Sequence, residues 1–252
     1  MTPGFDLSGR RALVTGANAG IGQAIAVALA AAGAEVLCAG RSAMDETLAA
    51  IAAAGGRGHA CTMDLSESDG AVAAFHAAAA AHGPVDVLVN NAGIIRRTDA
   101  LEFSAEDWDA VMNVNLRSAF FLTQAFARPL IAAGQGGAVI NIASLLSFQG
   151  GIRIASYTAS KSGLAGLTRL LACEWAGRGI RVNAIAPGYI ATANTAPLRA
   201  DPERNNAILA RIPAGRWGEA ADIGGAAVFL ASPAATYVHG VVLPVDGGWM
   251  AR

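Results

Sequence analysis

The sequence has few charged residues and almost no excess of either sign. Of its 252 residues, 15% are Asp, Glu, Lys or Arg, and the formal net charge at pH 7 is -1. Proteins that bind nucleic acids normally carry a clustered basic face, so the composition argues against a nucleic-acid partner. The hydrophobic share of 54% is enough for a sizeable core and excludes the polarity of a disordered chain.

Long, strongly apolar runs are missing as well. Apolar stretches such as residues 24–40 are rich in alanine and interrupted by Gly33 and Glu35, whereas a membrane-spanning helix needs about 20 strongly apolar residues. The first residues, MTPGFDLSGRRALVTG, lack the charged lead and long apolar core of a signal peptide. We therefore expect no membrane association and a cytoplasmic location.

Cysteine and histidine are scarce. The three cysteines, Cys38, Cys61 and Cys173, are far apart and odd in number, and the four histidines show no metal-ligand spacing. We expect all three cysteines to be buried, unpaired thiols of a protein in a reducing compartment. We expect no metal site.

Short apolar runs alternate with longer alanine- and leucine-rich segments along the chain. Several short runs are apolar on both faces, as expected of strands covered by helices on two sides. Strands that alternate with helices indicate crossover connections and a parallel sheet. The sequence predicts an α/β fold, with one doubly wound domain over residues 1–252 and about seven parallel strands flanked by helices. The predicted strands are residues 11–16, 34–40, 58–65, 85–93, 137–144, 180–187 and 240–248.

Residues 188–216 depart from this rhythm. The segment is rich in Pro, Asn and Arg and is too long for an ordinary connection. Long irregular segments inside compact domains are usually functional, so we expect a substrate lid here.

A glycine-rich turn follows the first predicted strand. VTGANAGIG places Gly16, Gly20 and Gly22 between that strand and the next helix. Glycines let the backbone approach a pyrophosphate closely, and the helix N-terminus supplies free N–H groups. A simple tight turn would have the same pattern, but further candidates follow at later strand ends, where ligands of open α/β sheets bind. These are Asp64, suited to an adenine amino group, and the stretch NNAG at 90–93.

The end of the second predicted strand should contact the adenosine ribose. A carboxylate there would repel a 2′-phosphate, but the sequence has Gly40-Arg41-Ser42 instead. The absent acid and the guanidinium favour NADP over NAD. Alternatively, Arg41 stacks on the adenine or is simply solvated.

Four polar residues form a catalytic candidate. Tyr157 and Lys161 in SYTASKSG are four positions apart, and hence on one face of a helix. A phenol has a pKa of about 10, and a nearby ammonium lowers it towards neutral pH. Ser144, at a strand end, can hydrogen-bond a substrate oxygen, and Asn115 in MNVNL can hold a water that connects Lys161 to solvent.

These motifs together resemble those of the short-chain dehydrogenases/reductases, over essentially the whole chain. The resemblance implies a Rossmann-like domain, hydride transfer with NAD(P) on CH–OH donors, and a homotetramer. It assigns Tyr157 as acid/base, Lys161 as its pKa tuner and ribose ligand, Ser144 as substrate orienter and Asn115 as relay. The implied cofactor-binding residues are Gly16, Asn18, Gly20, Ile21, Gly22, Arg41, Ser42, Asp64, Leu65, Asn91, Ala92, Gly93, Tyr157, Lys161, Pro187, Gly188, Ile190 and Thr192.

A finer resemblance lies in the stretches IIRRTDALEFS, SLLSFQGGIRIASYTASKSG, APGYIATANTAPLRAD, RIPAGRWG and VDGGWMAR. They are similar to those of the 2-keto-3-deoxygluconate 5-dehydrogenases, also called 2-deoxy-D-gluconate 3-dehydrogenases, with the gluconate 5-dehydrogenases as near relatives. This subgroup implies a small sugar acid as substrate. It also implies NAD, against the indication of Gly40-Arg41-Ser42, so the prediction is NAD(P).

A sugar acid requires a cation for its carboxylate, and the fork of arginine suits one. The candidates are Arg96, Arg97 and Arg153, with Gln149 and Asn194 suited to hydroxyls. Adjacent side chains on an extended segment point to opposite sides, so we expect one of the paired arginines, with a preference for Arg97, to face the substrate. A solvated surface position is the alternative for each arginine.

Three other functions share parts of this pattern. A gluconate 5-dehydrogenase differs only in substrate. A 3-oxoacyl-carrier-protein reductase has the same catalytic set but needs an apolar acyl channel, which paired arginines fit poorly. A non-catalytic nicotinamide-binding regulator has no need for a tuned phenol.

Overall fold

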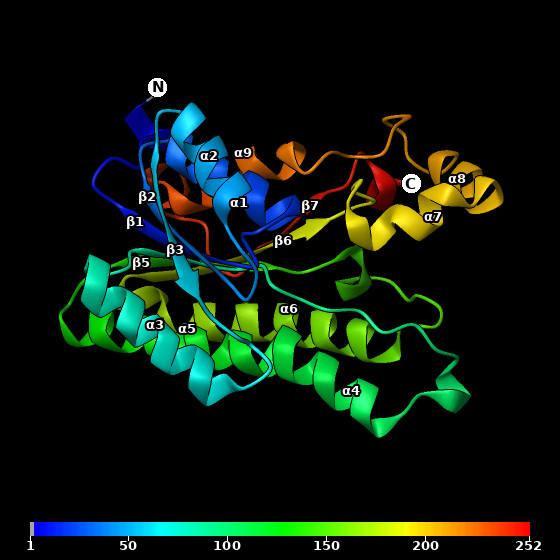
Figure 1. Cartoon of the computed structure of the whole chain (residues 1–252), viewed down its shortest axis with the longest axis horizontal. Coiled ribbons are helices and arrows are strands. Elements are labelled where there is room, and N and C mark those ends of the chain that lie inside the picture. Colours follow the sequence, from blue (N-terminus) through cyan, green and yellow to red (C-terminus); the bar gives the residue numbers. More distant parts are fainter. Residues whose placement is uncertain (1–2) are drawn as a thin grey trace.

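The computed structural model describes residues 3–252 and is built around a seven-stranded sheet (Figure 1). All neighbouring strands are parallel, in the order β3-β2-β1-β4-β5-β6-β7. The order reverses between β1 and β4, and ligands of open α/β sheets bind beyond the strand ends at such a point. The strands are β1 (Arg11–Thr15), β2 (Glu35–Gly40), β3 (Arg57–Thr62), β4 (Val87–Asn90), β5 (Gly137–Ile142), β6 (Ile180–Pro187) and β7 (Val242–Val245).

Helices cover both faces of the sheet. Figure 1 shows α1 (Gly20–Ala31), α2 (Asp45–Ala53) and α9 (Ala221–Ala231) on one face. The other face is covered by α3 (Ser68–His82), α4 (Ala105–Met112), α5 (Ser118–Ala132) and α6 (Ala155–Trp175). Two short helices, α7 (Ala196–Ala200) and α8 (Pro202–Leu209), project beyond the end of the sheet, next to the C-terminus.

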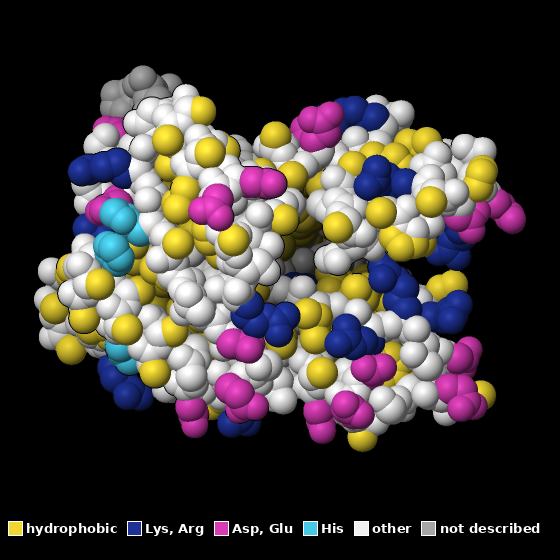
Figure 2. Space-filling model, in the orientation of Figure 1, with side chains coloured by type: hydrophobic (Ala, Val, Ile, Leu, Met, Phe, Trp, Pro, Cys, Tyr) yellow, Lys and Arg dark blue, Asp and Glu magenta, His cyan; other side chains and the backbone are white. Residues whose placement is uncertain are grey.

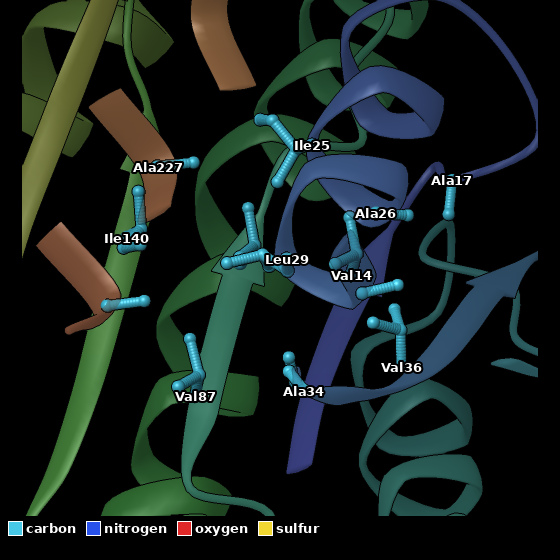
Figure 3. Packing of buried hydrophobic residues seen from close by; sticks show 14 of the residues in the cluster. Val14, Ala17, Ile25, Ala26, Leu29, Ala34, Val36, Val87, Ile140 and Ala227 are labelled. Carbon is cyan, nitrogen blue, oxygen red and sulfur yellow. The ribbon is translucent and has the colours of Figure 1, made fainter. Parts of the chain in front are cut away.

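Successive strand residues supply two separate cores. In β1, Val14 packs in the cluster under α1 and α9, while its neighbour Leu13 packs under α3 and α5, and neither side chain is exposed. Figure 3 shows the first cluster, where Ile25 and Leu29 of α1 lie over the sheet. Each fully buried Val, Leu or Ile side chain contributes about 1.5–3 kcal/mol. This two-sided burial explains why the strands are apolar on both faces.

The predicted fold class is confirmed, because each predicted strand overlaps an observed one and all seven are parallel. The prediction for the cysteines is wrong in one case. Cys38 is buried and Cys61 partly buried, but Cys173 is exposed on α6. The apolar composition around Cys173 could not indicate which side of the helix faces solvent. Within residues 3–252, no helix has both the length and the hydropathy needed to cross a membrane.

Candidate active site

A crevice of about 500 Å³ lies beyond the carboxyl ends of the strands. Figure 2 shows the molecule hollowed between the projecting α7–α8 segment and the helical layer below it, with basic side chains beside the hollow. The volume is typical of a small-molecule site. Residues at or just after the ends of six strands line it, namely Gly16, Gly40, Met63, Asn91, Ala143 and Pro187.

The glycine turn between β1 and α1 forms one wall. Gly16 and Gly20 have φ of 64° and 58°, in the left-handed region that favours glycine. The N-cap residue Ala19 makes no side-chain capping bond, so the side chain leaves the first N–H groups of α1 available to an anion. The turn therefore fits the pyrophosphate of a dinucleotide.

Asn91 ties the end of β4 to this turn. Its Nδ2 donates to the carbonyl oxygens of Thr15 and Gly16 at 2.8 and 3.2 Å. A Cβ atom at Gly22 would lie 2.2 Å from the Gly16 oxygen and 2.3 Å from Asn91 Nδ2. Gly22 is therefore required because the helix, the turn and β4 approach so closely here, and its role is packing.

Arg41 and Asp64 face each other across the ends of β2 and β3. Arg41 Nη1 lies 4.0 Å from Asp64 Oδ2, and both side chains are more than half exposed. The pKa of Asp64 is below its usual value, chiefly because the Ser66 N–H donates to the carboxylate, with a smaller contribution from Arg41. The guanidinium remains accessible from the crevice, which Arg41 and Ser42 both line.

Tyr157 and Lys161 lie one turn apart on α6 and both line the crevice. Lys161 Nζ is 5.6 Å from the centroid of the Tyr157 ring and donates to the carbonyl oxygen of Ile142 at 2.6 Å. Burial lowers the pKa of Lys161 to about 8, since the charged form is poorly solvated there.

Ser144 stands at the end of β5, where its Oγ accepts from the N–H of Leu146 at 3.2 Å. Burial raises the pKa of Tyr157, while a hydrogen bond with Ser144 and the charge of Arg97 lower it in part. We expected the lowering to come from Lys161. In the structure it comes from Ser144 and Arg97, because the ammonium is directed at a backbone carbonyl.

Asn115 lies behind the crevice wall. It belongs to a π-helical turn, Asn113–Arg117, that joins α4 to α5, and its side chain is buried. Its amide accepts from the N–H of Ile94 at 2.8 Å and donates to the Ile94 carbonyl at 2.9 Å and to Ser160 Oγ at 3.3 Å. π-helical turns are frequent at functional sites. This one directs the Asn115 side chain at Ile94, just after Gly93. The role of Asn115 as a proton relay stays a prediction.

The two adjacent arginines diverge. Arg96 Nε pairs with Asp107 of α4 at 3.0 Å, on the outer surface. Arg97 Nη2 donates to the carbonyl oxygen of Asn194 at 3.0 Å, and its charge acts on Tyr157. Neither arginine lines the crevice, but Arg97 contacts Asn194, which does, whereas Arg96 is directed at Asp107.

The remaining substrate candidates lie around the mouth. Asn194 lines the crevice, whereas Gln149 and Arg153 do not. Gln149 Oε1 accepts from Trp249 at 3.1 Å. Arg153 has a φ of 61°, and its carbonyl oxygen accepts from the N–H of Thr98 at 3.0 Å. Its backbone therefore joins the two loops that follow β4 and β5, while its side chain is exposed.

All eighteen residues predicted to bind the cofactor line the crevice. Further lining residues were missed, and most are neighbours of predicted ones in the same strand-end segments. These are Ala19, Gly40, Met63, Ser66, Ile94, Val114, Ile142, Ala143, Ala193 and Thr195. Among residues 3–252, no group of three or more His, Cys, Asp or Glu side chains is arranged to hold a metal ion.

Similarity to known proteins extends over nearly the whole chain. A family model described as Enoyl-(Acyl carrier protein) reductase, within the short-chain dehydrogenase group, matches residues 16–250. The chain is 56% identical over 248 residues to the 2-dehydro-3-deoxy-D-gluconate 5-dehydrogenase of Dickeya dadantii, with 98% of each chain covered.

Two solved structures match the fold, each with a TM-score of 0.95. The first, from Agrobacterium tumefaciens, is assigned as a 2-deoxy-D-gluconate 3-dehydrogenase with bound NADP; it is 64% identical, with 100% of both chains covered. The second, from Beutenbergia cavernae, is assigned as an NAD(P)-dependent gluconate 5-dehydrogenase with NADP at low occupancy. It is 54% identical, and the match covers 99% of this chain and 100% of that one.

Proposed function

The chain belongs to the short-chain dehydrogenase/reductase family, and we propose that it interconverts a secondary alcohol and a ketone on a small sugar acid of the 2-keto-3-deoxygluconate type. The observation that carries the proposal is the meeting of Ser144, Tyr157 and Lys161 in the same crevice as the glycine turn. The relative of Dickeya dadantii supports the substrate class, since 2-dehydro-3-deoxy-D-gluconate is the systematic name of the same acid.

The proton chemistry belongs to the chain's own residues. A bound nicotinamide supplies or accepts the hydride. With its pKa raised by burial, Tyr157 is a protonated phenol at neutral pH and donates to the carbonyl oxygen during reduction. Ser144 orients the same oxygen by a second hydrogen bond. In the oxidative direction Tyr157 must first lose its own proton, and the resulting phenolate then accepts the alcohol proton.

We propose NADP as the preferred cofactor. Gly40 supplies no carboxylate at the end of β2, and Arg41 and Ser42 offer a guanidinium and a hydroxyl to a 2′-phosphate. The bound NADP of the Agrobacterium tumefaciens relative agrees with this assignment.

Arg97 is the proposed ligand of the substrate carboxylate. It is the arginine near Tyr157, and its present acceptor, a neutral backbone carbonyl of Asn194, is one that a carboxylate can replace. Asn194 and the free amide nitrogen of Gln149 are suited to hydroxyls. We propose the segment 188–216, which includes α7 and α8, as the lid; its residues Gly188, Ile190 and Thr192 line the crevice.

We further propose one domain over residues 1–252, a cytoplasmic location and a homotetramer. Several large apolar side chains, among them Leu101 and Leu170, are exposed in the single chain, at 93% and 49%. Subunit contacts would remove such surface from water. Light scattering of the purified protein tests the oligomeric state.

The function is tested by a spectrophotometric panel. Sugar acids, neutral sugars and acyl thioesters are each offered with NAD and with NADP. Turnover of 2-keto-3-deoxygluconate or 2-deoxygluconate supports the proposal. Turnover of gluconate alone would identify a gluconate 5-dehydrogenase, and thioester turnover alone would identify an acyl-carrier reductase. Nicotinamide binding without any turnover would identify a regulator.

A further inference from the structure

Trp249 joins the C-terminal segment to the loop that carries Ser144. Its indole N–H donates to Gln149 Oε1 at 3.1 Å. Gln149 lies five positions after Ser144, and the Trp249 side chain is only 4% exposed. The indole is therefore buried where it meets the loop that follows β5.

A turn after β7 directs Trp249 inward. Gly247 and Gly248 have φ of 64° and 89°, a conformation that other residues rarely adopt. The Asp246 carboxylate holds the turn by accepting from the N–H groups of Gly248 and Met250, both at 2.9 Å. These local contacts hold the turn that directs the indole inward.

One side of the indole packs against the lid. Trp249 shares a buried cluster with Ile208 of α8 and with Ile212. The guanidinium carbon of Arg211 lies 3.9 Å from the indole ring centroid, and the Tyr189 ring centroid lies 4.7 Å from it. A cation this close to an indole face is attracted to it, so the lid has a specific attachment to Trp249.

The same cluster holds the catalytic turn. Leu145, the neighbour of Ser144, is 4% exposed and belongs to the cluster of Trp249. The N–H of Gln149 donates to the Leu145 carbonyl at 3.0 Å. The short 3₁₀ turn that begins after Ser144 is therefore fixed at its first residue by packing and beyond its end by the indole hydrogen bond.

We propose that Trp249 is a positioning residue that keeps Ser144 within hydrogen-bonding distance of Tyr157. Through the contacts of Trp249 with the lid, the position of Ser144 also depends on the lid. The inference deepens the proposed function and rests on it. Since an indole N–H can only donate, it also fixes the Gln149 amide with Oε1 towards Trp249. The Gln149 Nε2 group, which has no acceptor among residues 3–252, stays available as a donor.

The test compares Trp249→Phe with Trp217→Phe. Trp217 is a matched control because its ring also packs on Tyr189, but its N–H donates to Asn205 Oδ1 of α8 at 2.7 Å and not to the loop that carries Ser144. Trp249→Phe keeps an aromatic ring but loses the donor. We expect kcat for the sugar acid to fall about 5- to 10-fold, the scale of one lost hydrogen bond, with KM for NADP within about twofold of wild type. Trp217→Phe should keep the wild-type kcat.

A second readout does not depend on the substrate. Ultraviolet titration of Trp249→Phe, with Trp249→Phe/Tyr157→Phe as reference, isolates the ionisation of Tyr157. Loss of the Ser144 hydrogen bond should move that ionisation to higher pH than in wild type. Gln149→Met, a change at a partly buried side chain, should cause the same shift if Trp249→Phe fails to fold.

The outcomes separate the two proposals. A wild-type enzyme inactive on sugar acids, with a shifted Tyr157 titration in Trp249→Phe, would contradict the proposed function and support the positioning role. An active wild type whose kcat and titration are unchanged in both Trp249→Phe and Gln149→Met would overturn the positioning role alone.

Discussion

Lys161 lies one helical turn after Tyr157, and its ammonium is 5.6 Å from the phenol ring centroid while it donates to the carbonyl of Ile142. The lysine and the phenol are therefore close without being bonded. Ser144 and Arg97 are the groups that lower the tyrosine pKa against the effect of burial. The proposed catalytic set thus comprises four residues: Tyr157 and Lys161 on α6, Ser144 just after β5, and Arg97 in the loop after β4.

Tyr157→Phe should lower kcat by about 10²- to 10⁴-fold, the usual range for the loss of a general acid or base. Cofactor affinity should stay near wild type, because the ring and its packing remain. Steady-state kinetics and NADPH fluorescence titration measure the two effects. Tyr237→Phe, at a fully exposed position, is the control. Substantial remaining turnover in Tyr157→Phe would contradict the proton-transfer role.

Lys161 should make stability rise with pH between about 8 and 10.5. Its pKa is about 8 in the folded chain against 10.5 in the unfolded chain, so the unfolded state binds more protons over this interval and stability increases. Below pH 8, burial of the charged Lys161 lowers the free energy of unfolding by its full amount, about 3 kcal/mol. Cys38, with a pKa raised to about 12, has the opposite effect at higher pH.

Comparison with Lys161→Met isolates the contribution of Lys161 to the pH dependence of stability. Urea unfolding of the cofactor-free protein is measured at pH 7.5 and pH 9.5, a range chosen around the shifted pKa. The free energy of unfolding of wild type should rise relative to that of the variant as the pH increases. A constant difference between the two proteins would mean that the lysine is not shifted in the folded state.

Arg97→Ala should raise KM for the sugar acid about 10- to 100-fold, the scale of about 1.5–3 kcal/mol for a hydrogen bond to a charged group. Arg96→Ala should leave it within about twofold, because a surface ion pair of the Arg96–Asp107 kind contributes little. The adjacent positions make a matched pair. A larger effect from Arg96→Ala would reverse the assignment.

Arg41→Ala should weaken NADP about 10-fold or more and leave NAD nearly unchanged, because only the 2′-phosphate needs the guanidinium. Gly40→Asp should shift preference towards NAD by adding a carboxylate at the ribose. The new Cβ would lie 2.8 Å from the flexible end of Met44 and at an ordinary contact distance of 3.8 Å from Asn18 Oδ1, so the fold should accept it. Equal effects of Arg41→Ala on both cofactors would argue for stacking on the adenine.

The strands, their parallel order and the crevice at their ends could be predicted because each leaves a local signal. Two-sided burial makes the strands apolar, and the turn at Gly16 needs a residue tolerant of positive φ. The Trp249–Gln149 contact spans 100 positions, and no local pattern encodes it. The left-handed conformation of Arg153 likewise depends on the neighbouring loop that it contacts.

The divergence of Arg96 and Arg97 could also be predicted only in part, because it depends on contacts with distant residues. Alternation of side chains along an extended segment predicted that the two would diverge, and they do. Which one lies at the crevice depends on Asp107 and Asn194, which come from elements 11 and 97 residues away. The roles of the site residues themselves remain predictions for the experiments above.

We propose that this crevice reduces and oxidises an anionic sugar through Tyr157 and Arg97. The most direct test of this proposal is the ratio of kcat/KM for 2-keto-3-deoxygluconate to that for its uncharged methyl ester, in wild type and in Arg97→Ala. We expect wild type to favour the acid by about 10-fold or more, and Arg97→Ala to lose most of that preference. Equal kcat/KM for acid and ester in wild type would contradict a role for the substrate carboxylate in binding to this crevice.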